Sequence, residues 1–178
     1  DTIRKANLDR SDIGKIIATG YGRDVLDIAD QTVTEITCHA TGVHHLHSDC
    51  MTVIDIGGQD SKLIRMDGAG KVRDFVMNAR CAAGTGRFLE VVSDRLHIPL
   101  EDLGAISRTA ENPSSISSMC VVFAETEIVG LLASGEKSSN IIAGVQNSIA
   151  SRIVSMASGK MESPVVFTGG VALVSGMC

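Results

Sequence analysis

Hydrophobic residues in the first half of the chain occur in short runs bounded by glycine and polar residues, a pattern typical of β-strands. These runs are residues 13–19, 51–56, 61–66 and 71–77. The turn Asp67-Gly-Ala-Gly70 joins the last two runs and predicts an antiparallel hairpin. Residues 1–12 have the pattern of the end of a polar helix, and Gly20-Tyr-Gly-Arg23 is a predicted turn. Residues 25–40 combine helical spacing with many threonines, so the pattern assigns them to neither element.

After Asn78 the apolar spacing becomes helical. One apolar stripe is Phe88, Leu89, Val92 and Leu96; a second is Ile142, Val145, Ile149, Ile153 and Met156, on a long helix over about 138–159. Between the stripes we expect a short helix from Pro99, a polar loop over 108–118, a strand over 120–124 and a helix over 125–133. The last predicted strand, 164–168, ends in a Gly-Gly turn into another helix. This order predicts an α/β domain with helices packed on a mixed sheet.

Composition and charge narrow the class of protein. The chain has 178 residues, 44% of them hydrophobic and 21% charged, enough for one domain with a core. The net charge of -5 argues against nucleic acid as a partner. No apolar stretch reaches the length of a membrane span, and no signal segment is expected. Five cysteines, without a Cys-x-x-Cys pair, favour a reduced cytoplasmic compartment and argue against thioredoxin, zinc-ribbon and bacterial ferredoxin proteins.

Two strands end in paired glycines. In Asp55-Ile-Gly-Gly-Gln-Asp60, the amides of Gly57 and Gly58 can bind phosphate, and Asp55 can hold Mg²⁺ or its waters. A hairpin turn with a capping aspartate is the alternative. The second Gly-Gly pair, in Phe167-Thr-Gly-Gly-Val-Ala172, favours nucleotide binding. Neither Gly-x-x-x-x-Gly-Lys-[Ser/Thr] nor Gly-x-Gly-x-x-Gly occurs, which disfavours P-loop and Rossmann folds.

Two cysteines lie where helices or strands are expected to begin. Cys81 precedes Ala82-Ala-Gly-Thr-Gly86 and then a helix, whose N-terminus lowers a thiol pKa and suits ligation of an anionic cluster. Gly84 and Gly86 would let the backbone approach a cluster or a phosphate. Cys120 precedes Val-Val-Phe, and either cysteine could instead be a packed apolar residue. Two thiolates are too few for an iron–sulfur cluster, but a two-fold dimer would supply four.

Two further groups of residues could carry chemistry. Glu125 and Glu127 could act as a general base, as neighbours of magnesium, or as charges in the first turn of a helix. The segment Cys38–Cys50, with histidines between 39 and 47, is rich in metal-ligand types. Its spacing matches no standard zinc pattern, so a polar connection with incidental histidines is favoured over a zinc site.

Four motifs in order resemble the activator ATPases of 2-hydroxyacyl-CoA dehydratases, a family that includes the ATPase subunits of benzoyl-CoA reductase. The motifs are Asp55–Lys62, Asn78–Leu89, Cys120–Glu127 and Phe167–Ala172, and Ala18–Arg23 is also similar. The resemblance implies the actin/Hsp70/sugar-kinase ATPase fold, with a ribonuclease H-like lobe, binding ATP or ADP with Mg²⁺. It further implies a homodimer that holds one [4Fe-4S] cluster through Cys81 and Cys120 of each subunit. Ferredoxin or flavodoxin would donate the electron, which passes to a dehydratase or reductase component.

The resemblance also implies which residues form the nucleotide site. Those expected in catalysis are Asp55, Gln59 and Glu125; those expected to bind the nucleotide are Gly57, Gly58, Gln59, Asp60, Gly84, Gly86, Gly169, Gly170, Val171 and Ala172. The family's first phosphate hairpin has no counterpart here. We therefore expect residues 1–40 to be the end of lobe one and the crossover, and residues 41–178 to be a C-terminally truncated lobe two. ATPase activity is expected of the parent protein.

Other functions fit parts of the pattern. A benzoyl-CoA-type reductase ATPase would use the same chemistry with another partner. A relative of sugar or acetate kinases would transfer phosphoryl groups to a small acceptor and use its cysteines only in packing. A non-catalytic chain that binds nucleotide weakly and mainly dimerises is the remaining alternative.

Overall fold

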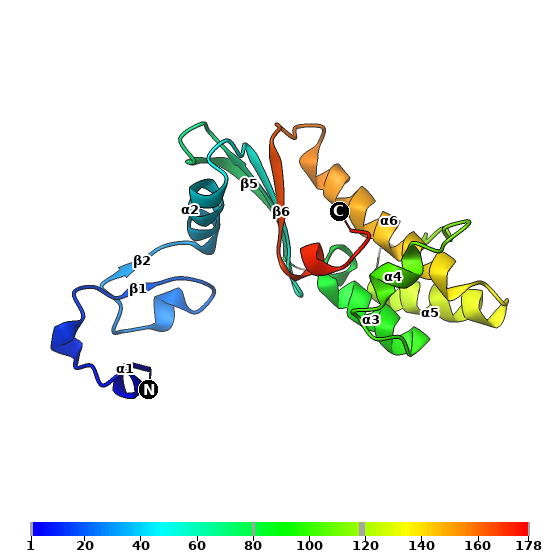
Figure 1. The fold of residues 1–178 in the computed structure, drawn as a ribbon, viewed down its shortest axis with the longest axis horizontal. Helices are drawn as coiled ribbons and strands as arrows, with labels where there is room; N and C mark the ends of the chain where they lie inside the picture. The colour runs from blue at the N-terminus through cyan, green and yellow to red at the C-terminus, as the bar shows by residue number, and fades with distance from the viewer. Residues whose placement is uncertain (1, 80, 118–119, 178) are drawn as a thin grey trace.

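The fold is built on one four-stranded sheet. The structure is a computed structural model that describes residues 2–79, 81–117 and 120–177 (Figure 1). The strands are β3 (Thr52–Ile56), β4 (Ser61–Met66), β5 (Val72–Asn78) and β6 (Val165–Thr168), in the spatial order β5-β4-β3-β6. β3, β4 and β5 pair antiparallel, and β3 pairs parallel with β6. The predicted mixed sheet and its hairpin are confirmed.

Helices cover both faces of the sheet (Figure 1). On one face lies α2 (Glu35–Leu46), and its buried residues Ile36, Ala40 and Val43 contact Val53, Ile64 and Met66. On the other face lies α6 (Ser138–Ala157), and the helices between β5 and α6 in the sequence pack with it. Successive side chains of a strand point to opposite faces. In β3, Val53 therefore faces α2, whereas Ile54 and Ile56 face the α6 side.

The larger core lies on the α6 side. It contains α3 (Gly86–Leu96), α4 (Leu103–Ser107), α5 (Val121–Ala133) and α6. Both predicted stripes contribute buried residues, among them Phe88, Leu89, Val92, Val145 and Ile149. The two helices predicted from these stripes are confirmed as α3 and α6. A 3.6-residue apolar period places its hydrophobic residues along one side of a helix, where they can be buried together. α4 begins at Leu103, later than the helix expected from Pro99.

The strand predicted over 120–124 is wrong. Cys120 has extended backbone angles, and a single helix, α5, runs from Val121 to Ala133. Val-Val-Phe has high strand propensity, but propensity yields to tertiary packing. Ala124 and Ile128, one helical turn apart, are both fully buried in the core that α3 and α6 share. Residues four apart lie on the same side of a helix, so α5 buries both in one core.

The histidine-rich segment is helical rather than a polar connection. It lies on α2, which begins after Thr34, whose side chain accepts a hydrogen bond from the Thr37 amide. Residues 25–34 before it contain the short strand β2 (Gln31–Thr32). β2 pairs parallel with β1 (Ile17–Ala18), a shorter strand than the run 13–19 predicted.

The remaining N-terminal elements are short. They are α1 (Thr2–Lys5), η1 (Arg10–Asp12) and η2 (Arg23–Val25). The Asp30 carboxylate joins this part together, since it accepts hydrogen bonds from the Ile16 amide at 2.7 Å and from the Arg10 guanidinium at 3.1 Å. Among the described residues, no helix is both long enough and apolar enough to cross a membrane.

Candidate nucleotide site and cysteine pair

The two Gly-Gly turns lie side by side. β3 and β6 are parallel, with Asp55 paired to Thr168, so the turns that follow them leave the same edge of the sheet. Gly169 shows how close the turns are: a Cβ built on it would lie 2.3 Å from the Ile56 carbonyl oxygen and 2.7 Å from Asp55 Oδ1. Its φ of +87° is also one that only glycine adopts readily. A glycine at this position is therefore required by both space and backbone conformation.

The segment after Cys81 meets both turns. The Gly86 amide donates to the Gly57 carbonyl at 2.8 Å, and the Arg87 amide donates to the Gly58 carbonyl at 2.9 Å. A Cβ on Gly86 would lie 3.2 Å from Gly57 O and from Val171 Cγ2. Three of the motifs identified in the sequence thus converge at the start of α3.

A hollow of about 140 Å³ opens where these motifs meet. Its lining combines turn backbone with apolar side chains: Gly58, Gly86, Leu89, Glu90, Leu100, Gly170, Val171 and Val174. Exposed turn backbone suits a phosphate or ribose, and apolar walls suit a planar base. Gly170 and Val171 follow β6 directly, and η4 (Gly170–Leu173) continues from them.

The buried Asp55 carboxylate forms an ion pair with Lys62. The Lys62 ammonium lies 3.4 Å from Asp55 Oδ2 and 2.8 Å from Asp60 Oδ1, so it bridges the two acids across the turn. Burial acts to lower the pKa of Lys62, but the hydrogen bond to Asp60 and the charges of both aspartates outweigh it, and the pKa is raised. Lys62 is therefore charged at neutral pH and holds the acids in place.

Three side chains enter this site that the sequence did not assign to it. His39 Nε2 lies 3.0 Å from Thr168 Oγ1, and His39 Nδ1 lies 3.6 Å from Asp55 Oδ2. Tyr21 donates its hydroxyl hydrogen bond to Asp60 Oδ2 at 3.2 Å. The alternation of side chains along β6 could have predicted the position of Thr168. Thr168 points to the same face of the sheet as Val166, and Val166 packs on the α2 side. No local pattern could place Tyr21, because 39 residues separate it from Asp60.

The contact between Tyr21 and Asp60 predicts a shifted titration. The hydrogen bond to the Asp60 carboxylate, followed by its negative charge, raises the pKa of Tyr21 above its ordinary value of about 10. The stabilisation is complete below that ordinary value and is lost as pH rises through the raised pKa. Asp60→Asn should lower the pKa of Tyr21, measured by absorbance titration of residues 1–178, which contain one tyrosine and no tryptophan. An identical titration curve in both proteins would contradict the contact.

Three other residues expected in the site are Gln59, Glu125 and Gly84. Gln59 is exposed at the tip of the first turn. Glu125 forms an ion pair with Arg95 of α3, and within the described residues no hydrogen bond or ion pair joins it to Asp55. Gly84 is buried, and a Cβ there would lie 2.8 Å from the Arg152 side chain, so its lack of a side chain accommodates Arg152.

Both candidate cluster ligands precede helices. Cys81 is partly buried, lies before η3 (Ala82–Gly84), and its carbonyl accepts a hydrogen bond from the Asn78 side chain at 2.8 Å. Cys120 is exposed at the start of α5. Across the described parts of the chain, no three His, Cys, Asp or Glu side chains form a metal-binding group, the histidine-rich segment included.

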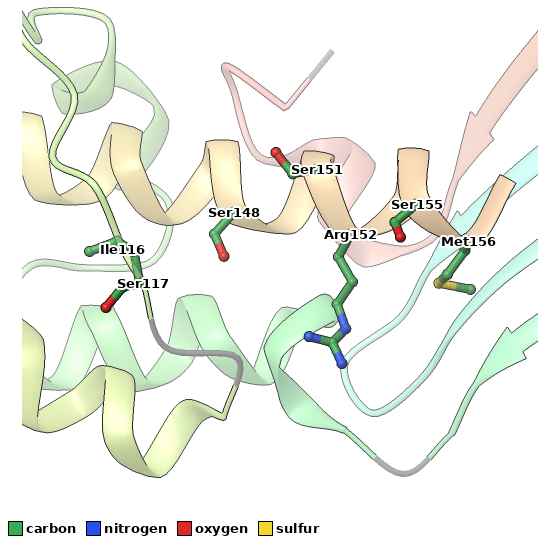
Figure 2. A pocket seen from close by; sticks show the side chains of 7 residues that line it. All are labelled: Ile116, Ser117, Ser148, Ser151, Arg152, Ser155 and Met156. Atoms are coloured by element: carbon green, nitrogen blue, oxygen red, sulfur yellow. The ribbon is translucent and has the colours of Figure 1, made fainter. Parts of the chain in front are cut away.

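A larger hollow of about 410 Å³ lies along α6 (Figure 2). It is lined by Ile116, Ser117, Ser148, Ser151, Arg152, Ser155 and Met156. Arg152 points from α6 toward the segment that contains η3, in agreement with its contact to Gly84. The hollow is thus separate from the Gly-Gly turns and borders the segment that follows Cys81.

The mixed sheet, its two Gly-Gly turns and its helical layers define an ATPase lobe of the actin/Hsp70/sugar-kinase type. The whole chain, residues 1–178, matches the BadF/BadG/BcrA/BcrD ATPase family, and the chain belongs to that family. Both the predicted fold and the resemblance seen in the sequence are thereby confirmed.

Solved structures agree closely. The activator of the 2-hydroxyisocaproyl-CoA dehydratase from Clostridium difficile, with bound ADPNP, superimposes with a TM-score of 0.86 at 43% identity, covering 98% of this chain and 66% of that one. Component A of the (R)-2-hydroxyglutaryl-CoA dehydratase from Acidaminococcus fermentans superimposes with a TM-score of 0.87 at 41% identity. The match covers 98% of this chain and 68% of that one.

Named relatives agree as well. The activator of lactoyl-CoA dehydratase from Anaerotignum propionicum is 46% identical over 97% of this chain and 67% of its own length. One of the subunits of benzoyl-CoA reductase from Thauera aromatica is 34% identical over 98% of this chain and 62% of its own length. The chain thus spans about two thirds of the length of the relatives it matches.

Proposed function

We propose that the protein containing this chain is an ATP-dependent activator that delivers an electron to a 2-hydroxyacyl-CoA dehydratase. The observation that carries the proposal is the convergence of both Gly-Gly turns with the segment after Cys81. A nucleotide in the hollow would lie directly against the helix that begins behind this cysteine. Similarity over 97% of the chain to an activator of lactoyl-CoA dehydratase supports the same function.

The residues present fit ATP or ADP with Mg²⁺. Asp55 and Asp60 supply carboxylate oxygens, the donors that Mg²⁺ prefers. Gly57, Gly58, Gly169 and Gly170 supply backbone without obstructing side chains. When bound, the cation would neutralise charge on the phosphates. Asp55 would hold the cation or its waters, Gln59 would orient the attacking water from the tip of the turn, and Lys62 would fix Asp55.

The role of Glu125 differs from that of Asp55. Its ion pair with Arg95 holds the start of α5 to the end of α3. We infer that Glu125 serves catalysis by keeping α5, and with it Cys120, in register with α3. Val171 and Ala172 would contact the nucleoside, and Gly84 and Gly86 would bring the Cys81 segment close to it.

We further propose a homodimer in which Cys81 and Cys120 of each subunit hold one [4Fe-4S] cluster, which supplies one-electron chemistry. Cys81 lies directly before η3, and Cys120 lies directly before α5. Ferredoxin or flavodoxin in the cytoplasm would reduce it. In this arrangement residues 1–40 form the end of lobe one and the crossover, and residues 41–178 belong to lobe two.

Iron and acid-labile sulfide, measured per dimer of anaerobically purified full-length protein, test the proposal. We expect about four of each, and their loss in Cys81→Ser and in Cys120→Ser. Cys38→Ser is the matched control, since Cys38 is also an exposed free cysteine and should not affect the iron content. A dimer without iron that still binds ATP would refute the redox function and favour a kinase-like phosphotransferase with structural cysteines.

An ATPase of a benzoyl-CoA-type reductase is the second candidate. The 34% identity to a component of benzoyl-CoA reductase supports it, but less strongly than the 46% identity to the activator of lactoyl-CoA dehydratase. Electron transfer to purified dehydratase and reductase components, measured side by side, distinguishes the two.

A further inference from the structure

His39 lies at the border between α2 and the nucleotide site. Its neighbours along the helix, Ile36, Ala40 and Val43, are buried against the sheet and fix where α2 sits. The His39 side chain itself is 29% exposed and contacts Asp55 of β3 and Thr168 of β6. α2 therefore presents an imidazole to the strand ends that carry both Gly-Gly turns.

Three side chains from three elements form a closed set of contacts. His39 Nε2 lies 3.0 Å from Thr168 Oγ1, and His39 Nδ1 lies 3.6 Å from Asp55 Oδ2. Thr168 Oγ1 in turn lies 3.3 Å from Asp55 Oδ1 and 3.3 Å from the Ile54 carbonyl oxygen. A hydroxyl has a single proton to donate. Its shortest contact is the one to His39.

The same carboxylate is approached from another side by Lys62. Lys62 and His39 both face Asp55 Oδ2, whereas Thr168 faces Oδ1. The terminal torsion of an aspartate is broad and has no strong preference of its own. The orientation of this carboxylate is therefore set by its neighbours, and His39 is the neighbour that also contacts the β6 side of the site.

We propose that His39 is a positioning residue for the Mg²⁺-nucleotide: it fixes the Asp55 carboxylate relative to the Gly169-Gly170 turn. This inference rests on the proposed nucleotide site. Asp55 lies in β3 before the first turn, Thr168 ends β6 before the second turn, and His39 contacts both residues. A cation held between Asp55 and the phosphates needs its carboxylate ligand in a defined direction, because Mg²⁺ demands near-octahedral geometry.

His39 also connects the site to the N-terminal part of the chain. On the same helix, Glu35 pairs with Arg23 at 3.2 Å, and the Cys38 thiol donates to Thr19 Oγ1 at 3.5 Å. α2 therefore contacts the candidate site through His39 and the segment from Thr19 to Arg23 through Glu35 and Cys38. The histidine thus joins the cation site to the element that precedes the sheet.

The test compares Mg²⁺-dependent and Mg²⁺-independent nucleotide binding in the full-length protein. His39→Ala should raise the Mg²⁺ concentration needed for half-maximal ATP binding by about 10-fold, the typical effect of a residue that orients a metal ligand. ATP binding in the presence of EDTA should not change. His39→Gln, which can still hydrogen-bond Thr168, should recover most of the Mg²⁺ dependence. His45→Ala is the matched control, because His45 is an exposed histidine of the same helix.

The outcomes separate this inference from the proposed function. A residue with a merely structural role would weaken binding equally with and without Mg²⁺ and would lower the melting temperature, and that result overturns the proposal. An unchanged Mg²⁺ dependence in His39→Ala also overturns it, while the nucleotide site stands. No ATP binding by the unmodified protein would overturn the nucleotide site and this inference together.

Discussion

Gly169→Ala is expected to lower the free energy of unfolding by about 3 kcal/mol and to abolish nucleotide binding. At φ +87° an alanine is strained, and its Cβ would lie 2.3 Å from the Ile56 carbonyl oxygen. The strain cannot be relieved by a side-chain rotation, because the obstructing atom belongs to the backbone of β3. The two turns would have to separate, and the hollow they line would change shape. Urea unfolding and equilibrium binding of a fluorescent ATP analogue measure the two effects.

Gly170→Ala is the matched control. Gly170 is the next residue, yet a Cβ there has no heavy atom within 4 Å. We expect its unfolding midpoint to stay close to that of the unmodified protein. If both substitutions destabilised equally, the close approach of the two turns would not be the reason that glycine occurs at position 169.

Asp55→Asn should reduce Mg²⁺-dependent ATP hydrolysis by about 100-fold. The substitution keeps the shape of the side chain but removes the negative charge that a cation would need. The fold should survive, because Lys62 keeps its 2.8 Å contact with Asp60. Steady-state phosphate release at varied Mg²⁺ measures the effect.

Asp94→Asn controls for the loss of one acidic charge, since Asp94 is exposed on α3. Its hydrolysis rate should match that of the unmodified protein. If Asp55→Asn hydrolysed ATP at the unmodified rate, Asp55 would not be a catalytic residue, and Asp60 would be the remaining candidate for holding Mg²⁺.

The sequence predicted the helical and strand elements best where apolar residues recur with one period. The stripe from Ile142 to Met156 predicted α6 almost to the residue, because 3.6-residue periodicity has one structural solution. The prediction failed at 120–124, where the local preference of Val-Val-Phe for strands is opposed by packing of Ala124 and Ile128. No local pattern contains that information.

Some residues of the candidate site could be predicted from the sequence, and others could not. The Gly-Gly pairs and the Cys81 segment were identifiable because phosphate binding and close backbone approach need glycine at fixed offsets within a few residues. The positions of His39 and Tyr21 were not, since each meets an aspartate far along the chain.

The sequence by itself determined the strands of the main sheet, the two helices with apolar stripes, the glycine turns, the two candidate ligand cysteines and the family. Those features depend on interactions within a few residues, or on motifs whose order along the chain is already specific. Only the tertiary structure decided that β3 and β6 lie next to each other, and that α2 faces the same side of the sheet as Asp55. Parallel pairing of strands that are distant in sequence is determined by burial of both sheet faces. That burial brings His39, Asp55 and Thr168 together in the nucleotide site.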